Sequence, residues 1–157
     1  MSRVLVIGDL HCPATHPNYM GFVKKIAKKY KTDRTVFIGD VIDHASISFH
    51  KKNPEHPSAI EEYRLATAGI KKWHRVYPEA EVMIGNHDER VFRLSADAGI
   101  PDHYIKPYND VYGTDGWEWV RNTQIDGVYY YHGVGSSGQY PAFHAAKLRL
   151  QSVVIGH

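Results

Sequence analysis

The sequence predicts an α/β fold, with a mainly parallel central sheet and helices on its faces. Short apolar runs rich in β-branched residues, VLVIG at 4–8, TVFIG at 35–39 and EVMIG at 81–85, are typical of buried strands. Segments with helical periodicity separate these runs. This alternation favours parallel pairing, because two parallel strands need a connection about as long as a helix.

Two helices are predicted between these strands. The segment 18–31 is amphipathic, with Asn18 as its expected cap and three apolar residues at four-residue spacing on one face: Phe22, Ile26 and Tyr30. The segment 58–77 begins with Ser58, and Glu61 stands three residues later. This capping-box pattern indicates a long helix.

The second half of the chain has a weaker pattern. A short helix is expected to end at Gly99, and 101–121 is predicted to be a long surface loop that leads into a strand near 117–120. Three further elements are predicted after it: a strand ending at His132, a helix at 140–150 and a strand at 152–156.

Bulk properties favour one soluble domain spanning 1–157. The net charge of +2 gives no support to a nucleic-acid partner, and no apolar stretch is long enough for a membrane. Cys12 is the single cysteine, which excludes an intramolecular disulfide and favours a cytoplasmic location. The oligomeric state is left open.

Oxygen ligands follow each of the first three predicted strands: Asp9, Asp40 and Asn86. In parallel sheets ligands bind at the carboxyl ends of the strands, so these side chains are expected at one edge. Histidines stand beside them or after later strands: His11, His87, His132 and His157. Carboxylate, amide and imidazole groups suit divalent Mn, Fe, Zn or Ni, with Mn the first choice. Two such ions can act together in phosphoryl displacement, and the Asp40 carboxylate could bridge them.

The motifs GDLH, GDVID, GNHD, YHG and GH occur in this order. In them the chain resembles the calcineurin-like metallophosphoesterases over nearly its whole length. The resemblance implies a layered α/β fold and a dinuclear metal site at the strand ends. The first metal would be held by Asp9, His11 and Asp40. The second would be held by Asp40, Asn86, His132 and His157.

The resemblance also implies a mechanism. A metal-bridging hydroxide would attack a phosphoester substrate, and His87 would act as the general acid that protonates the leaving oxygen. Asp88 would orient the His87 ring. Asp43 is expected behind the ligands, and His44 is expected either to touch substrate or to face solvent.

Two features depart from the family pattern. Phosphoprotein phosphatases carry an arginine after the second aspartate of GDxxD, but this chain has His44 there. This difference favours a phosphodiesterase over a phosphoprotein phosphatase. The family motif G-H-x-H is present only as far as His157, so the C-terminal end is expected to be incomplete and the first metal to lack one histidine.

Two alternatives to a phosphodiesterase follow from the sequence. One is a non-catalytic or impaired metal-binding domain, because the last histidine of the first metal site is missing. The other is a nuclease. It would have to bind nucleic acid without a strongly basic surface, since the segment 24–31 is the one basic cluster and is typical of a solvated helix face.

Overall fold

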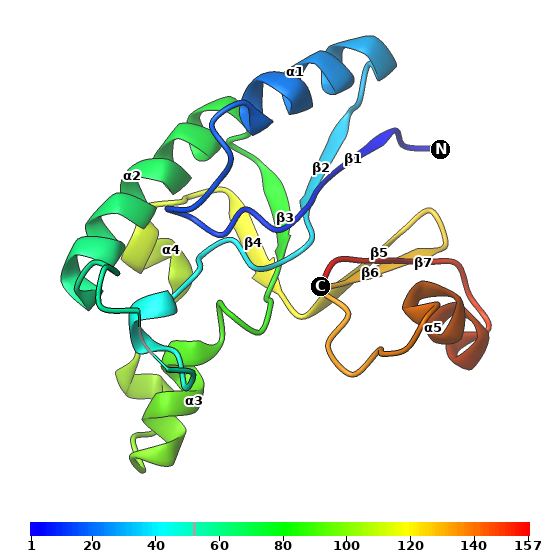
Figure 1. Cartoon of the computed structure of the whole chain (residues 1–157). Coiled ribbons are helices and arrows are strands. Elements are labelled where there is room, and N and C mark those ends of the chain that lie inside the picture. The colour runs from blue at the N-terminus through cyan, green and yellow to red at the C-terminus, as the bar shows by residue number, and fades with distance from the viewer. Residues whose placement is uncertain (52) are drawn as a thin grey trace.

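The computed structural model describes residues 1–51 and 53–157 (Figure 1). Along the chain the elements are β1 (Val4–Ile7), α1 (Tyr19–Tyr30), β2 (Arg34–Phe37), η1 (Ala45–Ile47), α2 (Ala59–Val76), β3 (Ala80–Met83), α3 (Arg90–Asp97), η2 (Asp102–Tyr104), α4 (Tyr108–Tyr112), β4 (Trp117–Val120), β5 (Asn122–Ile125), β6 (Val128–Tyr131), α5 (Pro141–Arg149) and β7 (Val153–Ile155).

The predicted fold class is confirmed by a four-stranded parallel sheet flanked by helices. Its strand order is β1-β2-β3-β4, and every neighbouring pair is parallel. Helices α1, α2 and α4 cover one face, where Ile70 and Trp73 of α2 are buried together with Phe37 of β2. The Phe37 ring also packs on Trp117 of β4, with 4.6 Å between the ring centroids. Because the strands are parallel, their carboxyl ends meet at one edge.

A second sheet covers the other face. It has the order β5-β6-β7, with β5 and β6 antiparallel and β6 and β7 parallel. Val36 and Met83 of the first sheet pack against Ile125 and Tyr130 of the second. Figure 1 shows the resulting layers, with α1 and α2 on one side and α5 beside the smaller sheet. The second sheet therefore brings the ends of β6 and β7 towards the edge where β1, β2 and β3 end.

Helix α2 forms as its sequence predicts. The Ser58 side chain accepts a hydrogen bond from the Glu61 backbone N–H, and the Glu61 carboxylate accepts one from the Ser58 backbone N–H. The capping box therefore satisfies two backbone donors that the first turn would leave unpaired.

Of the three residues predicted to form the apolar face of α1, only Ile26 packs against the core. Phe22 and Tyr30 are 59% and 55% exposed, whereas Val23 is buried. The side chains that pack beside Val23 are partly buried: Tyr19, Met20, Ile26 and Ala27. Helix α1 has two neighbouring apolar stripes, and the position of the sheet decides which one is covered. Asn18 precedes the helix, but its side chain makes no capping hydrogen bond.

The segment 101–121 is more ordered than the predicted loop. It contains η2 and α4 before β4, and α4 ends at Gly113 in the left-handed conformation. Its aromatic residues pack: the Tyr108 and Trp119 rings stack with 4.4 Å between their centroids. Strand β5 was not predicted, because its polar sequence NTQI follows β4 after one residue and has no apolar run.

Within residues 1–51 and 53–157, no helix is both long enough and apolar enough to cross a bilayer.

The core beneath the sheet gives the first testable prediction. Ile70 is completely buried on α2, whereas Leu65 on the same helix is 54% exposed. We expect Ile70→Ala to lower the free energy of unfolding by about 2–5 kcal/mol, because it leaves a cavity, and Leu65→Ala to change it by about 0.5 kcal/mol or less. Urea denaturation followed by circular dichroism measures both. Equal losses in the two variants would contradict the burial of Ile70 beneath the sheet.

Candidate metal centre

All six predicted metal ligands lie at the edge where strands of both sheets end. Asp9 and His11 follow β1, Asp40 follows β2 and Asn86 follows β3. From the second sheet, His132 directly follows β6 and His157 follows β7. Two overlapping groups can hold a metal ion, and Asp40 belongs to both: His11, Asp40 and His87, and Asp40, His132 and His157.

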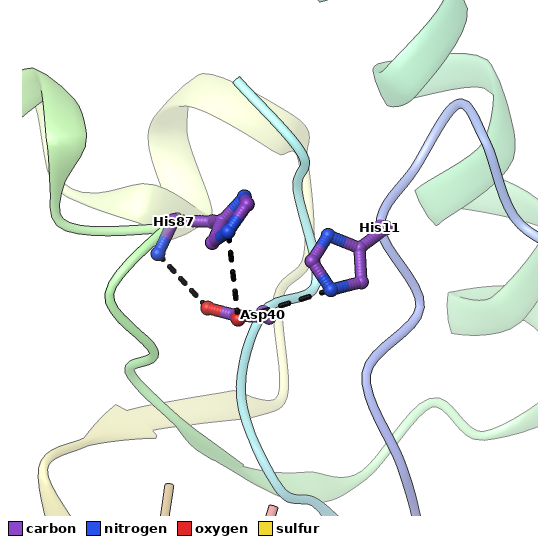
Figure 2. A group of neighbouring side chains, drawn as sticks. All are labelled: His11, Asp40 and His87. Carbon is purple, nitrogen blue, oxygen red and sulfur yellow. Dashed lines mark hydrogen bonds and ion pairs between the residues drawn. The ribbon is translucent and has the colours of Figure 1, made fainter. Parts of the chain in front are cut away.

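The Asp40 carboxylate is the centre of the cluster. It is almost completely buried, and its Oδ1 accepts a hydrogen bond of 2.9 Å from the backbone N–H of His87. Its Oδ2 lies 3.8 Å from Nε2 of His11 and 4.0 Å from Nε2 of His87. Figure 2 shows Asp40 between these two imidazole rings, which come from different loops. The rings are perpendicular, with 4.6 Å between their centroids.

The second group shares Oδ2 of Asp40 with the first. Nε2 of His132 is 3.1 Å from Oδ2 of Asp40 and 3.1 Å from Oδ1 of Asn86. The His132 and His157 rings are 5.0 Å apart between centroids. The backbone N–H of His157 donates to Oδ2 of Asp9 at 3.2 Å. These contacts link Asp9, Asp40, Asn86, His132 and His157 into one cluster.

Asp43 is a second carboxylate beside the cluster. Its Oδ1 lies 2.9 Å from Nδ1 of His11 and 3.1 Å from Nδ1 of His87. The backbone carbonyl of Asp43 also accepts a hydrogen bond of 2.7 Å from Nδ1 of His87. Asp43 therefore orients both imidazoles from behind.

Asp88 does not orient the His87 ring. Its buried carboxylate instead accepts hydrogen bonds from two backbone N–H groups, those of Ile42 at 3.0 Å and Gly85 at 2.8 Å. Asp88 thus ties together the loops that follow β2 and β3. The predicted role of Asp88 is therefore wrong, because both of its carboxylate oxygens are bonded to backbone N–H groups and not to the His87 ring.

His44 is turned inward. Its Nδ1 donates to the carbonyl of His87 at 2.9 Å, and its Nε2 accepts from the Tyr112 hydroxyl at 3.2 Å. His44 was expected either to touch substrate or to face solvent, but both of its ring nitrogens are bonded within the protein.

The ionisable groups of the centre influence each other. Burial alone would raise the pKa of Asp40, but hydrogen bonds from His132 and from the His87 backbone outweigh it, and the pKa is lowered. Burial alone would lower the pKa of His132, but the Asp40 carboxylate raises it. The hydrogen bond to Asp43 raises the pKa of His11. The isolated protein therefore stabilises its carboxylates with imidazole donors at the positions where a cation would lie.

Close approach explains why glycines precede these ligands. A Cβ at Gly85 would lie 2.2 Å from Oδ1 of Asp40 and 2.4 Å from the Asp40 backbone nitrogen. A Cβ at Gly39 would lie 2.4 Å from Nδ1 of His132. At Gly85 the Asp40 side chain occupies the space that a Cβ would need, and at Gly39 the His132 side chain does so. Glycine is therefore required at both positions.

The backbone of the centre is strained at three of the candidate ligands. His11, Asp40 and His157 have φ values of 46°, 50° and 66°. Residues with side chains adopt this left-handed region rarely, and such strain is typical of functional sites.

The residues present fit a pair of divalent metal ions. The side chains offer imidazole nitrogens and carboxylate or amide oxygens, the donor set that borderline and hard metals prefer. Oδ1 of Asp9 is buried, and no hydrogen-bond donor reaches it within the described ranges 1–51 and 53–157. A buried carboxylate oxygen without a partner is costly, and a bound cation would satisfy it.

Arg90 was not singled out from the sequence. It is the first residue of α3 and only 8% exposed. Its guanidinium donates to the backbone carbonyls of Asp43 at 2.7 Å and His44 at 3.0 Å, and its Nη2 lies 3.1 Å from Nε2 of His87. The available signal was its position three residues after His87, which places both side chains on the same side of a helical turn.

Residues 2–155 match the family model described as calcineurin-like phosphoesterase. No curated protein matches the sequence.

The space at Gly85 gives a prediction for metal binding. We expect Gly85→Ala to weaken Mn²⁺ binding by about 10–100-fold, since the new methyl group displaces the Asp40 carboxylate. Isothermal titration of the metal-free protein measures this change. Gly21→Ala on α1 is the matched control, because its Cβ meets no atom within 4 Å. An unchanged affinity in Gly85→Ala would show that Asp40 is not a metal ligand.

The burial of Asp88 gives a prediction for pH. Burial raises the pKa of Asp88 from 3.8 to about 7. Between these two values the folded protein holds a proton that the unfolded chain releases, so this group makes the protein less stable as the pH rises from 4 to 7. Asp88→Asn removes that contribution.

The slope of unfolding free energy against pH should therefore become more positive in Asp88→Asn, by up to about 1.4 kcal/mol per pH unit. Thermal unfolding of the metal-free protein at several pH values measures the slope. Asp97→Asn, on the exposed end of α3, serves as the control. Parallel curves for Asp88→Asn and the wild type would contradict the prediction.

Proposed function

Because the chain belongs to the calcineurin-like phosphoesterase family, we propose that it is a metal-dependent phosphoester hydrolase. The observation that carries this proposal is the convergence of two potential metal-binding groups on one carboxylate, that of Asp40. A shared carboxylate is the usual means of holding two ions close together, and a close pair of ions is suited to displacement at phosphorus.

Six residues would hold the two ions. Asp9, His11 and Asp40 would bind the first. The second would be bound by Asp40, Asn86, His132 and His157. The chemistry that such ions supply, when bound, is polarisation of the phosphoryl oxygens and hydroxide at neutral pH as the nucleophile. Mn²⁺ is the proposed metal, with Fe, Zn and Ni as alternatives.

His87 is proposed as the general acid that protonates the leaving oxygen. Its side chain is 21% exposed, so a substrate can reach it, and its Nε2 lies on the same side as Asp40. The carbonyl and carboxylate of Asp43 support its Nδ1. Asp88 contributes by holding the loops that carry Asp40 and His87 at a fixed separation.

A diester is the proposed substrate class. The position after Asp43 is His44, whose two ring nitrogens are both bonded within the protein. It therefore offers no guanidinium fork for the doubly charged phosphate of a monoester. A non-catalytic metal-binding domain and a nuclease are the two competing functions, and ester hydrolysis, metal titration and DNA cleavage separate all three.

The experiment compares hydrolysis of bis-p-nitrophenyl phosphate, p-nitrophenyl phosphate and p-nitrophenyl phenyl phosphate during a Mn²⁺ titration. We expect turnover that rises with two bound ions and is faster on the diesters. Stoichiometric binding without turnover on any ester would favour the non-catalytic domain. Cleavage of DNA that weakens steeply with salt would favour the nuclease.

The role of His87 is tested through the leaving group. We expect His87→Ala to lower kcat by about 10²–10⁴-fold on a diester that releases an alkoxide or phenoxide, because such groups need a proton to leave. The loss should be smaller for esters that release p-nitrophenolate, which is a stable anion. His144→Ala, on the exposed face of α5, is the control. Equal losses for good and poor leaving groups would rule out general-acid catalysis by His87.

A further inference from the structure

We propose that Arg93 binds an anionic oxygen of the phosphodiester substrate. It would supply, from helix α3, a guanidinium of the kind that the position after Asp43 lacks. This inference rests on the proposed function, because it adds a substrate-binding residue to the same centre. It is carried by the contact of Arg93 with Asn86 and by a positive charge that the protein leaves without an acidic partner within residues 1–51 and 53–157.

Arg93 lies directly beside the candidate metal centre. It is exposed on α3, and its Nη2 donates to the backbone carbonyl of Asn86 at 2.8 Å. The side-chain Oδ1 of the same Asn86 is 3.1 Å from Nε2 of His132, inside the cluster of candidate ligands. A single residue therefore separates the guanidinium from the place where the phosphoryl group would bind.

The positive charge of Arg93 is not paired within the protein. Glu89 stands four residues earlier, at the usual spacing for an ion pair on a helix, but its carboxylate pairs with Arg121 instead. In the part of the chain that the structure describes, the arginines that form ion pairs are Arg3, Arg34 and Arg121. An anionic ligand at the centre would therefore be the first acidic partner of Arg93.

The guanidinium of Arg93 is held in place but keeps donors free for a ligand. Its Cζ lies 5.7 Å from the centre of the Phe49 ring, which belongs to the loop after η1. The aromatic face attracts the cation and limits its freedom. The carbonyl of Asn86 uses one of the five N–H groups of the guanidinium. The remaining N–H groups can form charge-assisted hydrogen bonds with a phosphate oxygen.

Two other arginines near the same loop do not combine these properties. Arg90 is only 8% exposed and donates to two backbone carbonyls of the loop after β2. Arg121 is exposed, but its charge is paired with Glu89. Arg93 is exposed, fixed at a candidate ligand and unpaired within the described ranges, so it is the arginine suited to bind a substrate anion.

The first arm of the test measures anion binding without turnover. Dimethyl phosphate, a diester with no good leaving group, is titrated into the Zn²⁺-loaded protein. ¹H–¹⁵N spectra follow the arginine Nε–H signals, and Arg93→Lys identifies the signal of Arg93. We expect this signal to shift with dimethyl phosphate and to stay in place with trimethyl phosphate, which is neutral. A signal that stays in place throughout the dimethyl phosphate titration would overturn the proposal.

The second arm measures hydrolysis of bis-p-nitrophenyl phosphate. We expect Arg93→Met to lower kcat/KM by about 10–100-fold, mostly through KM, because a charge-assisted hydrogen bond to the substrate is lost. Arg93→Lys keeps the charge without the planar group and should lose about 3–10-fold. Phe49→Leu should lose about 2–5-fold, since the guanidinium loses its aromatic support. A loss below about twofold in Arg93→Met would overturn the proposal.

Two controls separate substrate binding from other effects. Arg121→Met removes a paired cation and should change kcat/KM by less than about twofold. A loss as large as that of Arg93→Met would indicate a general effect of charge and contradict the proposal. Titration with Zn²⁺ should give the same affinity for Arg93→Met and the wild type. Weaker metal binding in this variant would mean that Arg93 acts by positioning Asn86, which would also overturn the proposal.

The two arms distinguish this inference from the proposed function. If the wild type hydrolyses no ester, the proposed function fails, and the titration with dimethyl phosphate still decides whether Arg93 binds the anion. If the wild type hydrolyses the diester and Arg93→Met matches it, the proposed function stands and the role of Arg93 is refuted.

Discussion

Polar groups from both sheets converge on the carboxylate of Asp40. The backbone N–H of His87 binds one oxygen, and the imidazoles of His132 and His11 face the other. The carboxylate is buried, so it can stay charged only because these donors surround it. It also fits only because the neighbouring Gly85 has no side chain. His11, His87 and His132 all lie within 4.0 Å of this one carboxylate, and a cation there would replace contacts that these imidazoles supply.

The packing between the two sheets determines whether this centre can form. Val36 and Met83 belong to β2 and β3, the strands that lead to Asp40 and Asn86, whereas Ile125 and Tyr130 belong to the sheet that carries His132 and His157. A close-packed core transmits small shifts, so the separation of the two ligand groups depends on these apolar side chains. The stability of the fold and the geometry of the metal centre are therefore set by the same contacts.

Three charged residues near His87 have different roles. Asp43 binds Nδ1 of the ring, Arg90 faces Nε2, and Asp88 holds the loops together without touching the ring. This arrangement holds the ring through contacts with the loop after β2 and the start of α3. It also shows that the GNHD motif identifies His87 but does not identify the residues that contact its ring, because Asp43 belongs to a different loop and Arg90 to a helix.

The sequence by itself determined the α/β class, the capping box of α2 and the position of six candidate ligands after strands, because buried strands, helix caps and polar residues at strand ends are local patterns that each leave a signature at fixed spacing. Tertiary structure decided what those patterns leave open. It selected the buried stripe of α1, ordered 101–121 into α4 and β4, and built a second sheet from β5, β6 and β7. It also determined that Asp43 and Arg90, and not Asp88, contact the His87 ring. Such choices depend on contacts between segments distant in the chain, and spacing along one segment carries no record of them.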